Sequence, residues 1–144
     1  MERQIKFRAK RLDNGGWAYG GLIDVDDYCI IDQGNELYVE RDYVFRGDTH
    51  FFQLSGVMCD KKTIGQFTGL YDKNGTEIYE GDIIEITNPN TKEKYISTVK
   101  WNLKGYYAAI MGNNGNVILG YIDKSLICII GNIHDNPSLI SNKQ

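Results

Sequence analysis

The stretch Thr63–Asp82, with the sequence TIGQFTGLYDKNGTEIYEGD, decides the fold. Its first nine residues include Thr, Ile, Phe and Tyr, which favour strands. Asp72–Gly75 follows, and its Asn-Gly pair is a strong signal for a hairpin turn of a primed type. Glu77–Tyr79 returns as a second strand, and Glu80–Asp82 turns the chain into a third strand at Ile83–Thr87. The stretch therefore predicts three short antiparallel strands joined by tight turns.

The chain beyond this stretch continues to alternate between strand-like runs and turns. A polar loop at Asn88–Lys94 and a turn at Gly112–Gly115 separate runs rich in β-branched and aromatic residues. Further strands are predicted at Tyr95–Trp101, Tyr106–Met111, Val117–Ile122 and Ser125–Ile133. Asn136–Ile140, with Pro at its second position, predicts a single helical turn. Short strands with tight turns at this spacing predict a small barrel or sandwich over residues 63–144.

Residues 1–62 are predicted to form a separate N-terminal antiparallel β lobe. Residues 5–11 alternate between apolar and basic, and a period of two marks a half-buried strand. The turn at Asp13–Gly16 leads into a second strand at Trp17–Ile23. Within that strand, Gly20-Gly21 indicates a bulge or the close approach of another backbone.

The rest of this lobe is an acidic segment, residues 24–60, in which we recognise no motif. Short strands are expected at Tyr28–Ile31 and Leu37–Glu40, on either side of a turn. Arg46–Asp60 is predicted to be an irregular connection, with strand character at Phe51–Leu54. The secondary structure is therefore least defined by sequence in this segment.

The composition agrees with an all-β chain that has few or no helices. The chain has 16 glycines and 18 isoleucines, but only 4 alanines and 9 leucines, the residues that favour helices. No apolar run approaches the ~20 residues of a membrane span, and the first residues lack the apolar stretch of a signal peptide. Three cysteines far apart in sequence fit reduced thiols better than disulfides. We therefore expect a cytoplasmic protein with no membrane partner.

Four motifs together resemble those of one known family. They are TIGQFTGLYDKNGTEIYEGD with the following IIEI, the opening IKFRAKR, the hairpin WAYGGLI and the closing IIGNIHDNP, at residues 63–86, 5–11, 17–23 and 129–137. In this order they resemble the YopX family of phage and prophage proteins. The resemblance implies a mainly β protein with an SH3-like barrel in its C-terminal half, encoded by a bacteriophage or prophage and located in the bacterial host cell. It implies no known activity and no site residues.

The glycine-rich motif invites a binding interpretation, but its residues have structural uses. Glycines adopt turn and bulge geometries that other residues avoid, and Asp82 is expected to accept hydrogen bonds from backbone N–H groups of its turn. We therefore interpret the following as structural turn and barrel positions: Gly65, Gln66, Phe67, Gly69, Asn74, Gly75, Gly81 and Asp82.

The first strand offers a candidate contact surface. Lys6, Arg8 and Lys10 occupy alternate positions, so three cations share one face of the strand. On the next strand Trp17 and Tyr19 offer aromatic surfaces on which bases stack. This face is therefore a candidate site for nucleic acid or for a partner protein.

Charge pairing is the favoured alternative for this face. Residues 1–11 hold five basic residues and one acidic residue, a balance of +4, whereas residues 24–48 hold eight acidic and two basic residues, a balance of −6. These blocks favour pairing within one chain or between copies. A net charge of −3 also argues against a protein that coats duplex DNA.

No motif predicts a metal site, a cofactor or an active site. The candidate soft ligands do not recur at metal-ligand spacing; they are Cys29, Cys59, Cys128, His50 and His134. His134-Asp135 is not accompanied by a nucleophile motif. The adjacent carboxylates of Asp26 and Asp27 would point to opposite faces of a strand, which is poor geometry for shared acid–base chemistry. We therefore expect no cofactor and no enzyme.

Three function hypotheses follow from the sequence. The first is a non-enzymatic phage accessory protein that acts through protein–protein contacts, as a homo-oligomer and with an unidentified phage or host protein. The second is a nucleic-acid-binding module that uses the basic first strand. The third is an enzyme whose active site is assembled from residues distant in the sequence.

Overall fold

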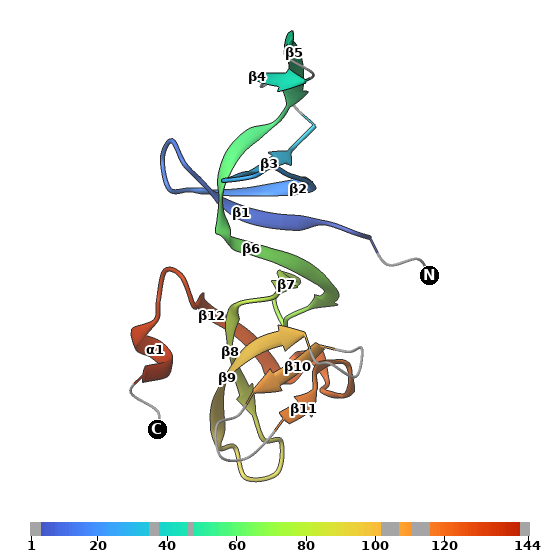
Figure 1. Cartoon of the computed structure of the whole chain (residues 1–144). Helices are drawn as coiled ribbons and strands as arrows, with labels where there is room; N and C mark the ends of the chain where they lie inside the picture. Colours follow the sequence, from blue (N-terminus) through green and yellow to red (C-terminus); the bar gives the residue numbers. More distant parts are fainter. Residues whose placement is uncertain (1–3, 35–37, 46–47, 102–106, 111–115, 142–144) are drawn as a thin grey trace. The chain divides into compact units, whose positions relative to one another are not determined.

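The computed structural model describes residues 4–34, 38–45, 48–101, 107–110 and 116–141 (Figure 1). These residues form antiparallel strands, two short 3-10 turns and one four-residue helix, so the prediction of an all-β chain with few helices is confirmed. The chain divides into two compact units. The first unit is Ile5–Gly65, and the second unit contains the residues from Gln66 onward. Within the described residues, no helix is long and apolar enough to cross a membrane.

The first unit is built around four strands: β1 (Phe7–Arg11), β2 (Trp17–Asp24), β3 (Cys29–Asp32) and the first half of β6 (Val57–Tyr71). They pair in the order β1-β2-β3-β6, and β6 also pairs with β1, so the sheet closes on itself. Alternate residues point into the closed sheet. The buried interior consists of Ala9, Ala18, Cys29, Ile31, Val57 and Cys59.

The close backbone approach expected in the second strand lies at Gly20. This residue has φ +156°, and a Cβ built on it would lie 1.9 Å from the carbonyl oxygen of Asp32. Any side chain would therefore collide with the neighbouring strand. The turn expected at residues 13–16 also forms, with Gly15 at φ +71°.

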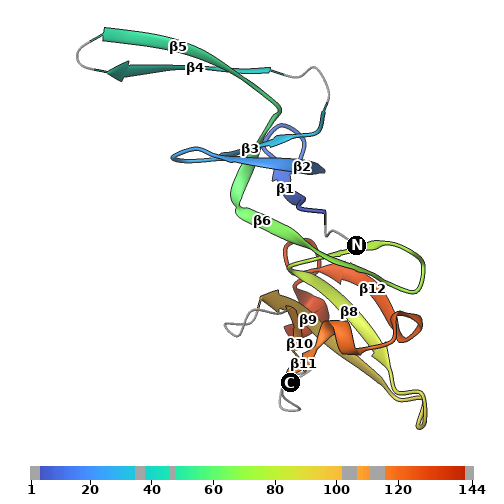
Figure 2. The ribbon, with the colours of Figure 1, turned by 90° about the vertical axis from the view of Figure 1, so that its right-hand side faces the viewer.

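Two further strands of this unit, β4 (Tyr38–Phe45) and β5 (Asp48–Ser55), form a separate two-stranded sheet (Figure 2). Their register runs from Tyr38 opposite Ser55 to Phe45 opposite Asp48. The strand character predicted at Phe51–Leu54 is therefore confirmed, whereas the irregular connection predicted around it, over residues 46–60, was wrong; residues 46–47 lie outside the described residues. Two strand-prone runs lie next to each other in sequence, and pairing satisfies their backbone groups locally.

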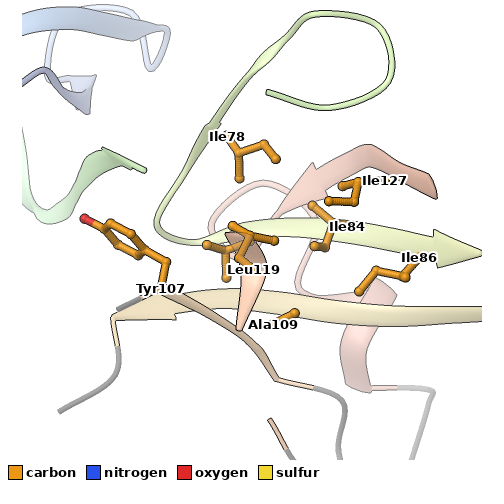
Figure 3. Packing of buried hydrophobic residues seen from close by; sticks show 8 residues of the cluster. Ile78, Ile84, Ile86, Tyr107, Ala109, Leu119 and Ile127 are labelled. Carbon is orange, nitrogen blue, oxygen red and sulfur yellow. The ribbon is translucent and has the colours of Figure 1, made fainter. Parts of the chain in front are cut away.

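The second unit contains β7 (Glu77–Tyr79) and a five-stranded antiparallel sheet in the order β11-β10-β9-β8-β12. The strands of this sheet are β8 (Asp82–Thr87), β9 (Lys94–Trp101), β10 (Tyr107–Ile110), β11 (Asn116–Ile118) and β12 (Ile127–Asn132). Figure 3 shows residues from β7, β8, β10 and β12 converging on one cluster. It contains Ile78, Ile84, Ile86, Val99, Tyr107, Ala109, Leu119 and Ile127. The implied SH3-like topology stays a prediction.

Two predicted strands of this unit are shorter than expected. Leu119–Tyr121 and Lys124–Leu126 are 3-10 turns rather than strand. The first turn places Leu119, 1% exposed, in the core. In the second, Asp123 accepts a hydrogen bond from the backbone N–H of Ser125. The predicted helical turn is present as α1 (Ser138–Ser141), and the predicted turn at residues 112–115 lies outside the described residues.

The hairpin between β6 and β7 depends on the buried carboxylate of Asp72. One oxygen, Oδ1, accepts hydrogen bonds from the backbone N–H groups of Asn74 (2.9 Å) and Thr76 (3.0 Å). The other, Oδ2, accepts one from Ile129 on β12, 57 residues away, at 3.1 Å. Asp72 therefore shapes its own turn and joins that turn to the sheet.

The turn itself differs from the expected primed type. Gly75 has φ +79°, but Lys92 is the only non-glycine among the described residues with a positive φ, so Asn74 lacks the conformation that a type I′ turn requires. Instead, the N–H of Gly75 donates a hydrogen bond to the carbonyl oxygen of Asp72. The N–H of Asp72 in turn donates one to the carbonyl oxygen of Thr76. The Asp72 carboxylate favours this wider turn because it accepts the N–H groups inside it.

Antiparallel pairing of β3 with β6 places Cys29 directly opposite Cys59. These cysteines are 30 residues apart in sequence, and both are fully buried. Burial is the main reason that the pKa of Cys29 is raised to about 11 and that of Cys59 is also raised. Both residues are free thiols.

We predict that Asp72→Asn destabilises the protein by about 1–3 kcal/mol, because an amide has one acceptor oxygen and leaves a buried N–H unsatisfied. Asp123→Asn is the matched control: its carboxylate is exposed and caps a short surface turn. We expect a cost of about 0.5 kcal/mol or less for the control. Denaturant unfolding measures both, and equal costs would contradict the assigned role of Asp72.

The buried thiols predict a loss of stability at alkaline pH. In the unfolded chain the Cys29 thiol ionises from about its ordinary pKa of 9.0, whereas in the folded chain it stays protonated up to about pH 11. Unfolding therefore releases a proton in this window, and stability falls as pH rises from 9 to 11. Cys29→Ala is expected to make this fall shallower. Parallel pH profiles of the free energy of unfolding would show that Cys29 does not contribute.

Candidate functional site

The outer face of the β1–β2 hairpin brings together the residues predicted to contact a partner. In the register of these strands Arg8 lies opposite Tyr19, and Lys10 lies opposite Trp17. The pair between them, Ala9 and Ala18, is fully buried in the closed sheet. Because neighbouring residues of a strand point to opposite faces, the cations and aromatics share the outer face. We call the set of Lys6, Arg8, Lys10, Trp17 and Tyr19 the cation–aromatic face.

Cation–π contacts organise this face. The guanidinium carbon of Arg8 lies 4.6 Å from the centre of the Trp17 ring, and Nζ of Lys10 lies 5.8 Å from it. Guanidinium is weakly hydrated and stacks readily on an indole ring. Arg8 is accordingly only 6% exposed, so the three cations do not form a uniformly solvated row. Tyr19, which is 43% exposed, is the aromatic residue of this face most open to solvent.

This geometry limits what the face can do. The chain's own cations already occupy the ring of Trp17, so a base that stacked there would have to displace them. The exposed surface of Tyr19 and the flanking charges remain suited to contact with an anionic or aromatic partner. The face is therefore better suited to surface contact than to insertion of bases.

Asp24, at the start of the acidic segment, forms an ion pair across the first unit. Asp24 pairs with Lys61 on β6, with Oδ1 2.8 Å from Nζ. The same Nζ donates to the carbonyl oxygens of Val25 (3.0 Å) and Asp26 (3.3 Å), and its hydrogen bond with Asp24 raises the pKa of Lys61. Lys61 thus holds the turn between β2 and β3. The predicted pairing of this segment with the first strand stays a prediction.

The contacts of Lys61 carry no signal in the sequence. Lys61 and Asp24 are 37 positions apart, and the pairing of β2 with β3 and of β3 with β6 brings their neighbourhoods together. A second pair, between Arg11 and Asp13, is local and lowers the pKa of Asp13. A sequence signal exists for the local pair, because Arg11 ends a predicted strand and Asp13 begins the predicted turn that follows.

Polar side chains of the glycine-rich motif form hydrogen bonds with backbone groups of the same motif. The N–H of Gln66 donates to the Glu80 carboxylate at 2.9 Å, and the N–H of Glu80 donates back to the carbonyl of Gln66 at 3.0 Å. The Thr68 hydroxyl donates to the carbonyl of Ile78 at 2.7 Å. As expected for Asp82, its Oδ2 accepts the N–H of Tyr79, at 2.8 Å. These side chains hold β6, β7 and the following turn together.

The other motif positions also lie in the fold. Gly65 is buried, and Phe67 is 2% exposed with its ring centre 5.5 Å from that of Tyr79. Gly69 and Gly81 have φ +85° and +88°, which favour glycine. Asn74 donates its backbone N–H to Asp72. The structure therefore gives each of these residues a conformational or packing use.

The candidate metal and acid–base residues are dispersed. Among the described residues, no group of three or more His, Cys, Asp or Glu side chains is placed to hold a metal ion. The backbone N–H groups of His134 and Asp135 both donate to Oδ1 of Asn132, and Nδ2 of Asn132 donates to the Asp135 carboxylate. This dipeptide therefore belongs to a local turn. The side chain of His50 lies outside the described part of the chain.

Comparison with known proteins agrees with this account of the fold. The crystal structure of protein EF1440 from Enterococcus faecalis is similar, with a TM-score of 0.56 and 21% sequence identity. The alignment covers 96% of this chain and 99% of that chain, and at this identity it shows the fold alone. Among curated proteins there is no match. The family described as YopX protein matches residues 6–141, nearly the whole chain, and the protein therefore belongs to the YopX family.

Proposed function

We propose that the protein is a non-enzymatic protein–protein interaction module that assembles with copies of itself. In this proposal it is a bacteriophage or prophage accessory protein in the cytoplasm of the bacterial host, and its second unit is an SH3-like barrel. An unidentified phage or host protein is a further partner. The β4–β5 hairpin is the observation that carries the proposal.

This hairpin is a two-stranded sheet by itself. Among the described strands, β4 and β5 pair with each other and with no other strand. The outer edge of each strand therefore presents backbone N–H and C=O groups that another chain can pair with. A two-stranded hairpin alone is marginally stable in water, so contact with a further surface would stabilise it.

The buried carboxylates support a structural rather than a chemical use of the acidic positions in the motif Thr63–Asp82. Asp72 and Asp82, both 2% exposed, accept hydrogen bonds from backbone N–H groups. Catalytic carboxylates must instead reach a substrate. Among the residues whose burial the structure describes, the two most buried acids thus hold turns.

We predict that the full chain is a dimer or larger assembly at micromolar concentration. Multi-angle light scattering across a dilution series measures the mass directly. The expected result is a mass of two or more chains that falls on dilution, because association follows mass action. A mass of one chain throughout the series would overturn the homo-oligomer.

A nucleic-acid-binding module is the second candidate, because the cation–aromatic face combines alternate cations with the half-exposed Tyr19. We predict that Lys6→Ser combined with Lys10→Ser weakens binding to single-stranded nucleic acid. The slope of log affinity against log salt should fall by about 1.4, since each lost phosphate contact removes about 0.7. Fluorescence anisotropy at several salt concentrations measures this slope.

The matched control for this prediction also removes two positive charges, but from the second unit. Lys73 and Lys124 are exposed, and replacing both with Ser should leave the affinity unchanged. Equal loss in the control, or no binding of DNA or RNA by the parent protein at low salt, would rule out this face as a nucleic-acid site.

A further inference from the structure

We propose that Cys29 and Cys59 are a redox-sensitive pair, which forms a disulfide between β3 and β6 when glutathione disulfide oxidises the chain. The structure contains the reduced state, in which both residues are free thiols. The inference goes beyond the proposed function, because it concerns a covalent change within one chain and requires no partner protein. It follows from the strand register, from the contacts of the two sulfurs and from the connection that the bond closes.

The register places the two cysteines within reach of each other. Cys29 and Cys59 are direct partners in the antiparallel pairing of β3 with β6. Cα atoms of directly opposite residues lie about 4.5–5.5 Å apart, and disulfides span Cα separations of about 4.4–6.8 Å. The two residues can therefore be joined without a shift of register.

Both side chains point to the same side of this strand pair. Each is fully buried, and both belong to the interior cluster of the first unit. The Cys29 thiol donates to the carbonyl oxygen of Cys59, at a sulfur–oxygen distance of 3.8 Å, so it already lies against the backbone of its partner. The Cys59 thiol instead donates along its own strand to the carbonyl oxygen of Val57, at 3.5 Å. Bond formation therefore requires side-chain rotation and an approach of the strands by about 1 Å or less.

Packing alone explains a small residue at each position, but not a thiol at both. The neighbouring interior residues Ala9 and Ala18 are also small, and cysteine can serve as a small apolar side chain. After burial, the proximity of Cys59 is the largest cause of the raised pKa of Cys29, because two adjacent thiols resist ionising together. The two sulfurs are thus close enough to interact.

The bond would close the connection that carries the β4–β5 hairpin. The chain leaves β3 at Asp32 and enters β6 at Val57, and both hairpin strands lie between these points (Figure 2). The two cysteines are 30 positions apart in sequence. A link across a loop of this length restricts the unfolded chain and so favours the folded one. The disulfide would therefore anchor the base of the hairpin covalently.

The bond forms through two thiol–disulfide exchanges. The thiolate of one cysteine attacks a sulfur of glutathione disulfide, which forms a mixed disulfide and releases one glutathione thiolate. The thiolate of the other cysteine attacks the protein sulfur of this mixed disulfide, which forms the Cys29–Cys59 bond and releases the second glutathione thiolate. The two cysteines lose two electrons and two protons in total, and the two released glutathione molecules gain them.

Burial controls when this exchange occurs. Thiolates are the attacking species, whereas burial keeps both thiols protonated and away from glutathione. The exchange therefore takes place from states in which β3 and β6 have separated. The same burial protects the disulfide from reductants once the strands have closed. The pair thus retains the redox state in which the first unit last closed.

The test maps disulfides in the full chain carrying Cys128→Ala, which removes the third thiol. The reduced protein is incubated with glutathione disulfide, either in native buffer or in urea near its unfolding midpoint, and is then returned to native buffer and alkylated. Mass spectrometry of proteolytic peptides identifies the link. We expect the Cys29–Cys59 link to form in urea, and to form about tenfold or more slowly in native buffer because opening is rare.

Urea unfolding of the oxidised and reduced forms measures the effect on stability. We expect the link to lower the equilibrium constant of unfolding about a hundredfold. Cys29→Ala is the matched control, because it also leaves two thiols, Cys59 and Cys128, which lie in different units. Treatment of this control with glutathione disulfide should leave its stability unchanged.

Three outcomes would overturn the inference. The first is absence of the Cys29–Cys59 link after incubation near the midpoint, and the second is an oxidised form no more stable than the reduced form. The third is an equal gain in stability by the Cys29→Ala control. Oxidation that is equally fast in native buffer would overturn the control by burial. Mapping of the parent chain keeps the inference testable if Cys128→Ala does not fold.

Discussion

The carboxylate of Asp72 joins local and long-range structure in the second unit. A buried charge is costly unless hydrogen bonds replace the lost water, and here three backbone N–H groups do so. Two of them shape the β6–β7 turn, and the third belongs to Ile129 on β12. Since β12 pairs with β8 at the edge of the five-stranded sheet, this one side chain aligns the hairpin with the sheet that contains the core.

The motif Thr63–Asp82 has a structural use in this fold. The side chains of Thr68 and Glu80 bind the backbone of their own hairpin, as those of Asp72 and Asp82 bind the backbone of their turns. A side chain committed to a buried backbone group is not available to a ligand without loss of that bond. Functional contacts are therefore better sought on surfaces outside the motif, such as the β1–β2 outer face and the β4–β5 hairpin.

The sequence predicted features that depend on neighbouring residues. The turns at residues 13–16 and 72–75 have Asn-Gly pairs, and Gly20 was correctly associated with a close backbone approach. By contrast, the closure of β1 on β6 and the pairing of Cys29 with Cys59 depend on the register of distant strands. One-residue shifts reverse the faces of a strand, so spacing in sequence does not define such contacts. The contacts of Lys61 with the turn between β2 and β3 were not predicted for the same reason.

The topology of the first unit gives a physical reason for the position of the proposed interaction surface. Pairing of β1 with both β2 and β6 closes the small sheet, and closure satisfies the backbone groups that an open edge would expose. The β4–β5 hairpin is inserted between β3 and β6, after the chain has supplied three of the four closing strands. It therefore lengthens one connection without interrupting the closed sheet. An inserted hairpin can change its faces and edges at little cost to that sheet, which makes it a suitable place for contacts that must differ from one partner to another.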